Sequence, residues 1–98
     1  MSDEKSNIPK LNDTNFPQWF SRMKVHLKSR EILQVCINPQ PEEMTAAAKD
    51  KDEKKRSQAV DVIMRHLGDA AFDNVITPEI DEDPHLILTK INETYASK

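Results

Sequence analysis

Four side chains of the types that bind metal ions or act as nucleophiles are spread along the sequence: His26, Cys36, His66 and His85. A zinc site requires three or four such ligands in one cluster, and a Cys–His nucleophile requires a third group that orients the histidine. The spacing of these residues shows neither arrangement. We therefore expect partly exposed helix histidines and a small buried thiol, with no metal site.

Carboxylates that could act in acid–base chemistry occur as the pair Glu42–Glu43 and in the segment from Glu79 to Asp83. Both groups fall in expected loops or helix starts, where acidic side chains stabilise the helix dipole. The sequence has one glycine, Gly68, so it cannot form a typical glycine-rich phosphate loop. These patterns predict a protein that is not an enzyme, with no cofactor and no small-molecule substrate.

Basic residues gather in the segment from Asn15 to Arg30, which contains no acidic residue. Two interpretations of this helix face stay open: a solvated surface, or a contact surface for RNA phosphates or for an acidic partner. The acidic segment Glu79–Asp83 of another copy would be a matching partner. The segment from Lys49 to Arg56 mixes both signs and is closer to a solvated face. The candidate RNA or partner contacts are Arg22, Lys24, Lys28 and Arg30.

Large apolar side chains recur in the same segment at helical spacing and fall on one face of a helix. They are Phe16, Trp19, Phe20, Met23 and Leu27. Such a stripe forms a core far more often than it forms a ligand site. Phe20 and Met44 are the candidates for a more exposed position, where a large apolar side chain would favour self-association.

The composition sets bounds on the class of protein. The chain has 98 residues, of which 32% are charged and 37% hydrophobic, and a net charge of −3. These values predict one small domain with a modest core, and a net charge too small for nonspecific nucleic-acid binding by the whole domain. No apolar run approaches the roughly 20 residues that span a bilayer, and the single cysteine fits a reducing compartment. We expect a soluble, cytoplasmic protein without a membrane partner.

Residues 1–10 are polar and aperiodic, so we expect a flexible N-terminal segment there and a helical domain over residues 11–98. Asn15 and Gln18 have the spacing of a capping box, and Pro17 suits a first helical turn. A helix that carries the aromatic stripe is therefore predicted from this point. Residues 30–37 are predicted as a second, short helix, and their β-branched content leaves a strand as the alternative.

A long helix is predicted over residues 44–67, which contain neither Gly nor Pro. Its first half is almost entirely polar, so only its second half is expected to be buried. Gly68 stands where a left-handed helix cap is expected, and Asp69 is the expected cap of a further short helix. Asp83 and Pro84 form a cap-plus-proline pair, which predicts a last helix that runs to the end of the chain.

These elements predict an all-α protein, a compact bundle of about five helices whose first, third and last members form the core. No segment alternates as a strand does, and no hairpin dipeptide occurs. The predicted core residues are Phe16, Trp19, Met23, Leu27, Val60, Ile63, Leu67, Leu88, Ile91 and Tyr95.

The segment from Lys10 to Phe16 (KLNDTNF), followed by Trp19, resembles the start of the capsid region in Gag polyproteins of copia-type LTR retrotransposons. That family has the pattern K-L-x-G-x-N-[FY]-x-x-W, from which this chain departs at Asp13, where Gly is usual. The segment from Ala59 to Leu67 is similar to the family's alanine- and isoleucine-rich helix.

Near the end of the chain, Leu88, Ile91 and Tyr95 fall where the same family has a W-x-x-L-x-x-x-Y pattern, with Leu88 in place of the usual Trp. The resemblance covers about residues 8–97. Leucine fills a helix-packing position with less area than tryptophan, so this departure affects the fold little.

The resemblance implies the N-terminal lobe of a capsid, a helical domain that associates with copies of itself and, in the complete Gag, forms a shell around RNA. The sequence carries no Cys/His zinc knuckle, protease, integrase or reverse transcriptase, so we expect a fragment of such a polyprotein or the product of a host gene derived from one. The main hypothesis is a structural self-association module that contributes to virus-like particles. The alternatives are an RNA-binding or chaperone module that uses the basic first helix, and a host-derived adaptor that binds a peptide in a helical groove.

Overall fold

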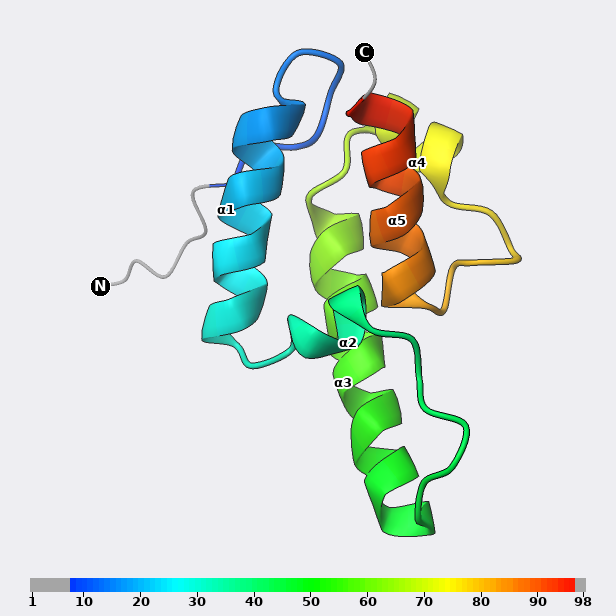
Figure 1. Cartoon of the computed structure of the whole chain (residues 1–98). Coiled ribbons are helices and arrows are strands. Elements are labelled where there is room, and N and C mark those ends of the chain that lie inside the picture. Colours follow the sequence, from blue (N-terminus) through cyan, green and yellow to red (C-terminus); the bar gives the residue numbers. More distant parts are fainter. Residues whose placement is uncertain (1–7, 97–98) are drawn as a thin grey trace.

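Five helices account for most of residues 8–96, the part of the chain that the computed structural model describes (Figure 1). They are α1 (Phe16–Ser29), α2 (Gln34–Ile37), α3 (Ala46–Arg65), α4 (Asp69–Val75) and α5 (Pro84–Tyr95). Within this range the β-type contact is an isolated bridge between Leu11 and Leu67. The predicted all-α class with five helices is confirmed, and the strand alternative for residues 30–37 is wrong because they form a turn followed by α2.

The helices pack around α5 and α2. The short helix α2 contacts both α3 and α5, while α3 and α4 each contact α5. Figure 1 shows α1 along one side of the molecule, α4 toward the other, and the N-terminal half of α3 running out beyond the other helices. This arrangement leaves one end of α3 without neighbouring helices.

Helix α1 is held by its aromatic stripe. Trp19 is fully buried, and its indole Nε1 donates a 2.9 Å hydrogen bond to the carbonyl oxygen of His66 at the end of α3. Phe16 stacks on Tyr95 of α5, with the ring centroids 6.1 Å apart. The stripe therefore joins α1 to both of the other long helices, and the polar end of the indole keeps a hydrogen-bond partner.

Helix α1 ends in a Schellman motif without a glycine. Glu31 has a φ of 64°, in the left-handed region. Its N–H donates to the carbonyl of Lys28 at 3.0 Å, and the N–H of Ile32 donates to the carbonyl of Leu27 at 3.0 Å, which is the hydrogen-bond pattern of this motif. Ile32 and Leu27 are both buried in the core, so hydrophobic packing offsets the cost of the left-handed glutamate.

Gly68 does not form the predicted left-handed cap. Its φ is −72° and it is the N-cap of α4, so Asp69 is the first residue of that helix and not its cap. The chain stays extended here because the N–H of Leu11 donates to His66 at 2.9 Å and the N–H of Gly68 donates to Leu11 at 3.3 Å. A Cβ at position 68 would lie 3.1 Å from the carbonyl oxygen of Leu11. The glycine therefore serves a close approach of two backbone segments.

The predicted capping box at the start of α1 is not formed. Asn15 is the N-cap residue, but its side chain makes no cap hydrogen bond. Its Nδ2 donates to the carbonyl of Lys10 at 2.8 Å, and its Oδ1 accepts from the N–H of Asn12 at 2.9 Å. The amide is thus engaged by the turn that precedes the helix, so it does not reach the first helical N–H groups.

Two other helices begin on side-chain caps. Thr45 Oγ1 accepts from the N–H of Ala48 at 3.1 Å and starts α3. Asp83 accepts from the N–H groups of His85 and Leu86 and starts α5, as its pairing with a following proline predicts.

Nine of the ten predicted core residues are buried, and the exception is Val60, which is partly buried. The buried stripe of α3 runs through Ala59 and Ile63, so Val60 falls at its edge. The two short helices add to the core of the three helices expected to form it, through Val35, Cys36, Ala71 and Val75.

Most of the predicted flexible segment, residues 1–7, lies outside the described residues, as do residues 97–98. In the remainder of that segment, Ile8 is partly buried and packs against the core. Leu11, at the start of the predicted domain, is buried. The described chain is therefore already in contact with the core at Ile8, three residues before the expected domain boundary.

Candidate functional site

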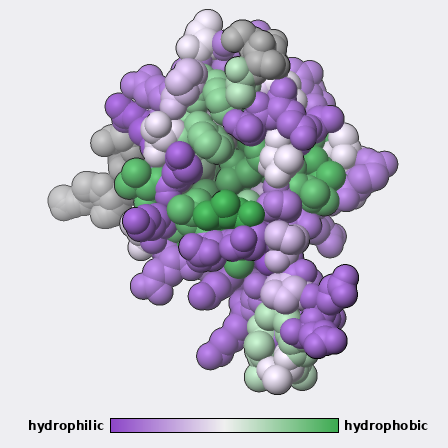
Figure 2. Space-filling view, viewed as in Figure 1, coloured by the Kyte–Doolittle hydropathy of each residue, from purple (hydrophilic) through white to green (hydrophobic). Residues whose placement is uncertain are grey.

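An apolar groove lies between α1 and α5 beside α2, and we call it the α1–α5 groove. It encloses about 280 Å³. Figure 2 shows hydrophobic side chains gathered in the middle of this face and surrounded by hydrophilic ones. The apolar lining comes from three elements and consists of Phe20, Leu33, Cys36, Ile37 and Leu88.

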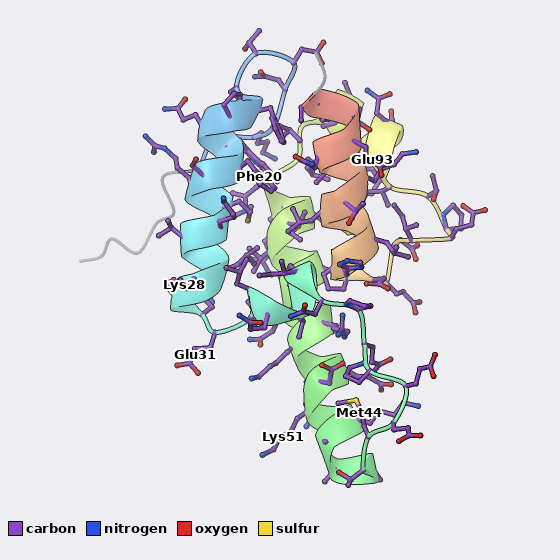
Figure 3. All side chains as sticks on the ribbon, viewed as in Figure 1. Phe20, Lys28, Glu31, Met44, Lys51 and Glu93 are labelled. Atoms are coloured by element: carbon purple, nitrogen blue, oxygen red, sulfur yellow. The ribbon has the colours of Figure 1, made fainter. Side chains whose placement is uncertain are left out.

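Part of this lining is open to solvent. Ile37, the last residue of α2, is 54% exposed, and Phe20 is partly buried. Figure 3 shows Phe20 extending from α1 into the space between α1 and α5. Met44, the other residue predicted to be more exposed, is also partly buried and lies beside the N-terminal half of α3 in the same view. The groove is thus an apolar surface whose covering would be favourable in water.

The rim of the groove is polar and carries no negative charge among the described residues that line it: Lys24, His85, Thr89 and Asn92. The ammonium of Lys24 lies 5.1 Å from the centroid of the Phe20 ring. This cation–π contact holds a positive charge over one wall of the groove.

Cys36 contributes an unreactive sulfur to the groove. Burial raises the pKa of its thiol to about 12, against a smaller lowering by Arg56. The Sγ atom lies 3.6 Å from the carbonyl oxygen of Ile32. Because the thiol stays protonated at neutral pH, it behaves as a small apolar side chain, which is the buried thiol that the sequence suggests.

The basic side of the molecule is α1. All four predicted contact residues are exposed there or directly after it: Arg22, Lys24, Lys28 and Arg30. Two of them are fixed by neighbours, Lys24 by Phe20 and Arg30 by His26, whose Nε2 accepts from the Arg30 Nε at 3.3 Å. The structure therefore leaves all four predicted cations exposed on α1 or directly after it, and one of them, Lys24, stands at the rim of the groove.

The other side of the molecule is acidic. Residues 68–89 contain six carboxylates and neither Lys nor Arg. All six precede Pro84, and Figure 1 places α4 and the connection to α5, which carry them, on the side away from α1. The exposed members are Asp69, Asp73, Glu79 and Glu82. The chain thus separates its charges onto two sides, although its net charge is only −3.

A pair of histidines lies between α1 and the end of α3. The rings of His26 and His66 meet edge to face with centroids 5.9 Å apart. Burial lowers the pKa of His26, and the charges of Arg30 and His66 lower it further. Neutral His26 can accept the hydrogen bond from Arg30, so the pair serves packing. Among residues 8–96, no three His, Cys, Asp or Glu side chains form a group that could hold a metal ion.

A buried cation, Arg56, joins three elements. The sequence pattern did not predict its burial, because residues 49–56 mix both signs and are closer to a solvated face. It is 8% exposed. Its Nε lies 2.6 Å from the Asp52 carboxylate, and its Nη1 donates to the carbonyls of Val35 at 2.9 Å and Asn38 at 3.3 Å. The Asp83 carboxylate lies 4.0 Å away. The i,i+4 spacing to Asp52 was the one available signal, and it is equally typical of a solvated pair.

The comparisons with known proteins do not identify the chain. No family model matches it, and neither a curated protein nor a solved structure does. The resemblance to copia-type Gag therefore stays a prediction. None of the helices in residues 8–96 combines the length and the apolar character required to cross a bilayer.

Proposed function

We propose that this chain is a structural self-association module of the type found as the N-terminal capsid lobe of copia-like retrotransposon Gag, contributing to virus-like particle assembly. The observation that carries the proposal is the separation of charge between α1 and residues 68–83, which hold the six carboxylates. Opposite charges on two sides of one molecule make copies of it attract each other and favour a defined orientation. The α1–α5 groove lies beside the basic side and supplies apolar area for such contacts.

The chemistry of the polar groups supports a scaffold and not an enzyme. The thiol of Cys36 is buried with a pKa raised to about 12, and His26 is engaged by Arg30. Arg56 is occupied by one carboxylate and two backbone carbonyls. Each group is committed to holding the fold. A cysteine kept as a buried thiol suits the cytoplasm, where we propose that the module works.

Sedimentation velocity over a range of protein and salt concentrations tests the proposal. We expect association that grows with protein concentration and weakens as salt screens the charges. Reversal of Arg22, Lys24, Lys28 and Arg30 to Glu should abolish the association. The matched control reverses Lys49, Lys51, Lys54 and Lys55, which changes the net charge equally on the projecting half of α3. Monomers at every concentration, or equal loss in both variants, would contradict the proposal.

The exposed cations of α1 also favour an RNA-binding function as the alternative. Fluorescence anisotropy with a single-stranded RNA separates the two. Salt-sensitive binding that is lost on reversal of the α1 charges, in a protein that stays monomeric, would favour the RNA function. Absence of RNA binding together with salt-sensitive association would favour the scaffold.

A further inference from the structure

The α1–α5 groove has the size and chemistry of a receptor for a single large apolar side chain that arrives with negative charge beside it. Its volume of about 280 Å³ is lined by apolar atoms at its centre. Lys24 is fixed above the Phe20 wall, and Lys28 follows one helical turn later on α1. A side chain flanked by carboxylates would fill the groove and meet the Lys24 ammonium at its rim, with the Lys28 ammonium one turn further along α1.

The described part of the chain itself presents such a side chain. Phe72 of α4 is 40% exposed, which is unusual for a phenylalanine on a small protein. Asp69 lies one turn before it and Asp73 directly follows it, and both carboxylates are exposed. The segment from Gly68 to Thr89 itself contains no lysine or arginine. An aromatic side chain with an acidic surround is thus displayed on the side away from α1.

The other large apolar side chains that are exposed in residues 8–96 do not match the groove in this way. Val25 belongs to the basic helix α1, so its approach would bring like charges together. Ile37 is part of the groove lining. Leu86 lies on α5, one of the two helices that form the groove, directly after the rim residue His85. Phe72 alone among these four stands on an element whose charge complements Lys24.

We propose that Phe72 of one copy inserts into the α1–α5 groove of a second copy, while Asp69 and Asp73 pair with Lys24 and Lys28. This contact rests on the proposed self-association and names its two surfaces. A buried aromatic side chain surrounded by a polar rim is the usual form of an interface hot spot.

The two surfaces are different, so the contact is heterologous. Each copy keeps a free groove at one side and a free Phe72 at the other. Successive copies therefore add head to tail, and they form a ring if the rotation closes and an open array if it does not. A symmetric pair, in which two grooves face each other, would instead stop at two copies.

A complementation experiment with two variants tests the contact. Phe72→Ala removes the inserted side chain and keeps the groove, whereas Ile37→Glu places a carboxylate in the groove lining and keeps Phe72. Each variant alone should associate at least about tenfold more weakly than the original protein by sedimentation equilibrium. Val25→Ala is the matched control, because it truncates an exposed apolar side chain outside the groove and should leave association unchanged.

An equimolar mixture of the two variants should form a 1:1 heterodimer that does not grow, since one functional groove and one functional Phe72 remain. With the Phe72→Ala chain labelled by ¹⁵N, amide shifts should change around Lys24, Leu33 and Leu88. Circular dichroism establishes that each variant is folded, and Phe72→Leu, which keeps apolar volume, should retain most of the association.

The outcomes separate this contact from the proposed function. If the original protein associates but the mixture stays monomeric, or if Phe72→Ala associates normally, the contact is wrong and self-association uses another surface. If Ile37→Glu weakens association and Phe72→Ala does not, the groove pairs with a different segment, which also overturns the contact. If the original protein stays monomeric at all concentrations, the proposed function and the contact both fail.

Discussion

The two halves of α3 belong to one uninterrupted helix and have opposite environments. Residues 46–55 are exposed except for Asp52, which is partly buried, and Figure 1 shows this half projecting beyond the other helices. Residues 56–65 bury Arg56, Ala59 and Ile63. The projecting half is rich in Ala and Lys, which favour helix without neighbours, whereas the other half is held by packing. Helix formation and burial are therefore separate properties of this chain, and variants in each half should behave differently.

Trp19→Ala should have the largest effect, because it removes the large buried side chain that links α1 to the C-terminal end of α3. The indole is fully buried and donates to His66. We expect a loss of about 3–5 kcal/mol in the free energy of unfolding. That is a large part of the roughly 5–10 kcal/mol typical of a small domain, and urea denaturation followed by circular dichroism measures it.

Trp19→Phe is the companion variant, since it keeps an aromatic ring and loses the hydrogen bond and part of the volume. It should fall between the original protein and Trp19→Ala. Val25→Ala, on the exposed face of the same helix, should change stability by less than about 0.5 kcal/mol. A small effect of Trp19→Ala would contradict the view that packing against α1 holds the second half of α3.

Arg56→Ala comes next, because Arg56 marks the boundary between the two halves. Its removal leaves the Asp52 carboxylate and the carbonyls of Val35 and Asn38 without this partner in a mostly buried place. We expect a loss of about 3 kcal/mol in the free energy of unfolding. Arg56→Lys keeps the charge but not the planar fork, so it should recover only part of the loss.

If Arg56→Ala lowers the free energy of unfolding no more than Lys54→Ala does at an exposed position, the boundary between the two halves of α3 does not depend on the buried cation. Thermal unfolding of the two variants side by side makes this comparison. Arg56→Met offers a further reference, because it leaves Asp52 without its cation as Arg56→Ala does but fills similar volume, so the difference between the two variants measures the packing of the side chain.

The sequence predicts the apolar core well, because the spacing of Trp19, Met23 and Leu27 shows directly which face of a helix is apolar and therefore buried. It does not predict the role of Arg56. The carbonyls that bind this side chain belong to Val35 and Asn38, and their position depends on how helices pack rather than on local pattern. The i,i+4 spacing of charges is the same in both halves of α3, so it carried no information about burial.

Backbone conformation after α1 and before α4 is a second feature that the sequence did not predict. Residue type suggests the left-handed position at Gly68, yet the left-handed residue is Glu31, where the packing of Ile32 holds the backbone. Of the groove, Phe20 was a candidate from its place on the stripe. Ile37 joins it only because α2 lies beside both α1 and α5, which is a tertiary fact.

Thr45→Ala tests the projecting half of α3, whose first turn this residue caps. The variant removes the N-cap hydrogen bond to the N–H of Ala48, and this is worth about 1 kcal/mol in a helix. Because the projecting half has little packing to lose, we expect the loss as faster local opening, measured by amide hydrogen exchange at residues 48–52. The free energy of global unfolding should change less than this local value. A full loss in global stability would show that the projecting half folds cooperatively with the core.

Two exposed ion pairs give the smallest effect and the most direct comparison of the halves. Lys54–Asp50 at 3.5 Å lies in the projecting half, and Arg65–Asp61 at 2.9 Å lies in the packed half. All four side chains are more than half exposed, so double-mutant cycles should give about 0.3–0.5 kcal/mol of coupling for each pair. Equal coupling would mean that the halves differ through buried contacts alone. A coupling above about 1 kcal/mol for Arg65–Asp61 only would show that surface charge also distinguishes them, and the account from packing would be incomplete.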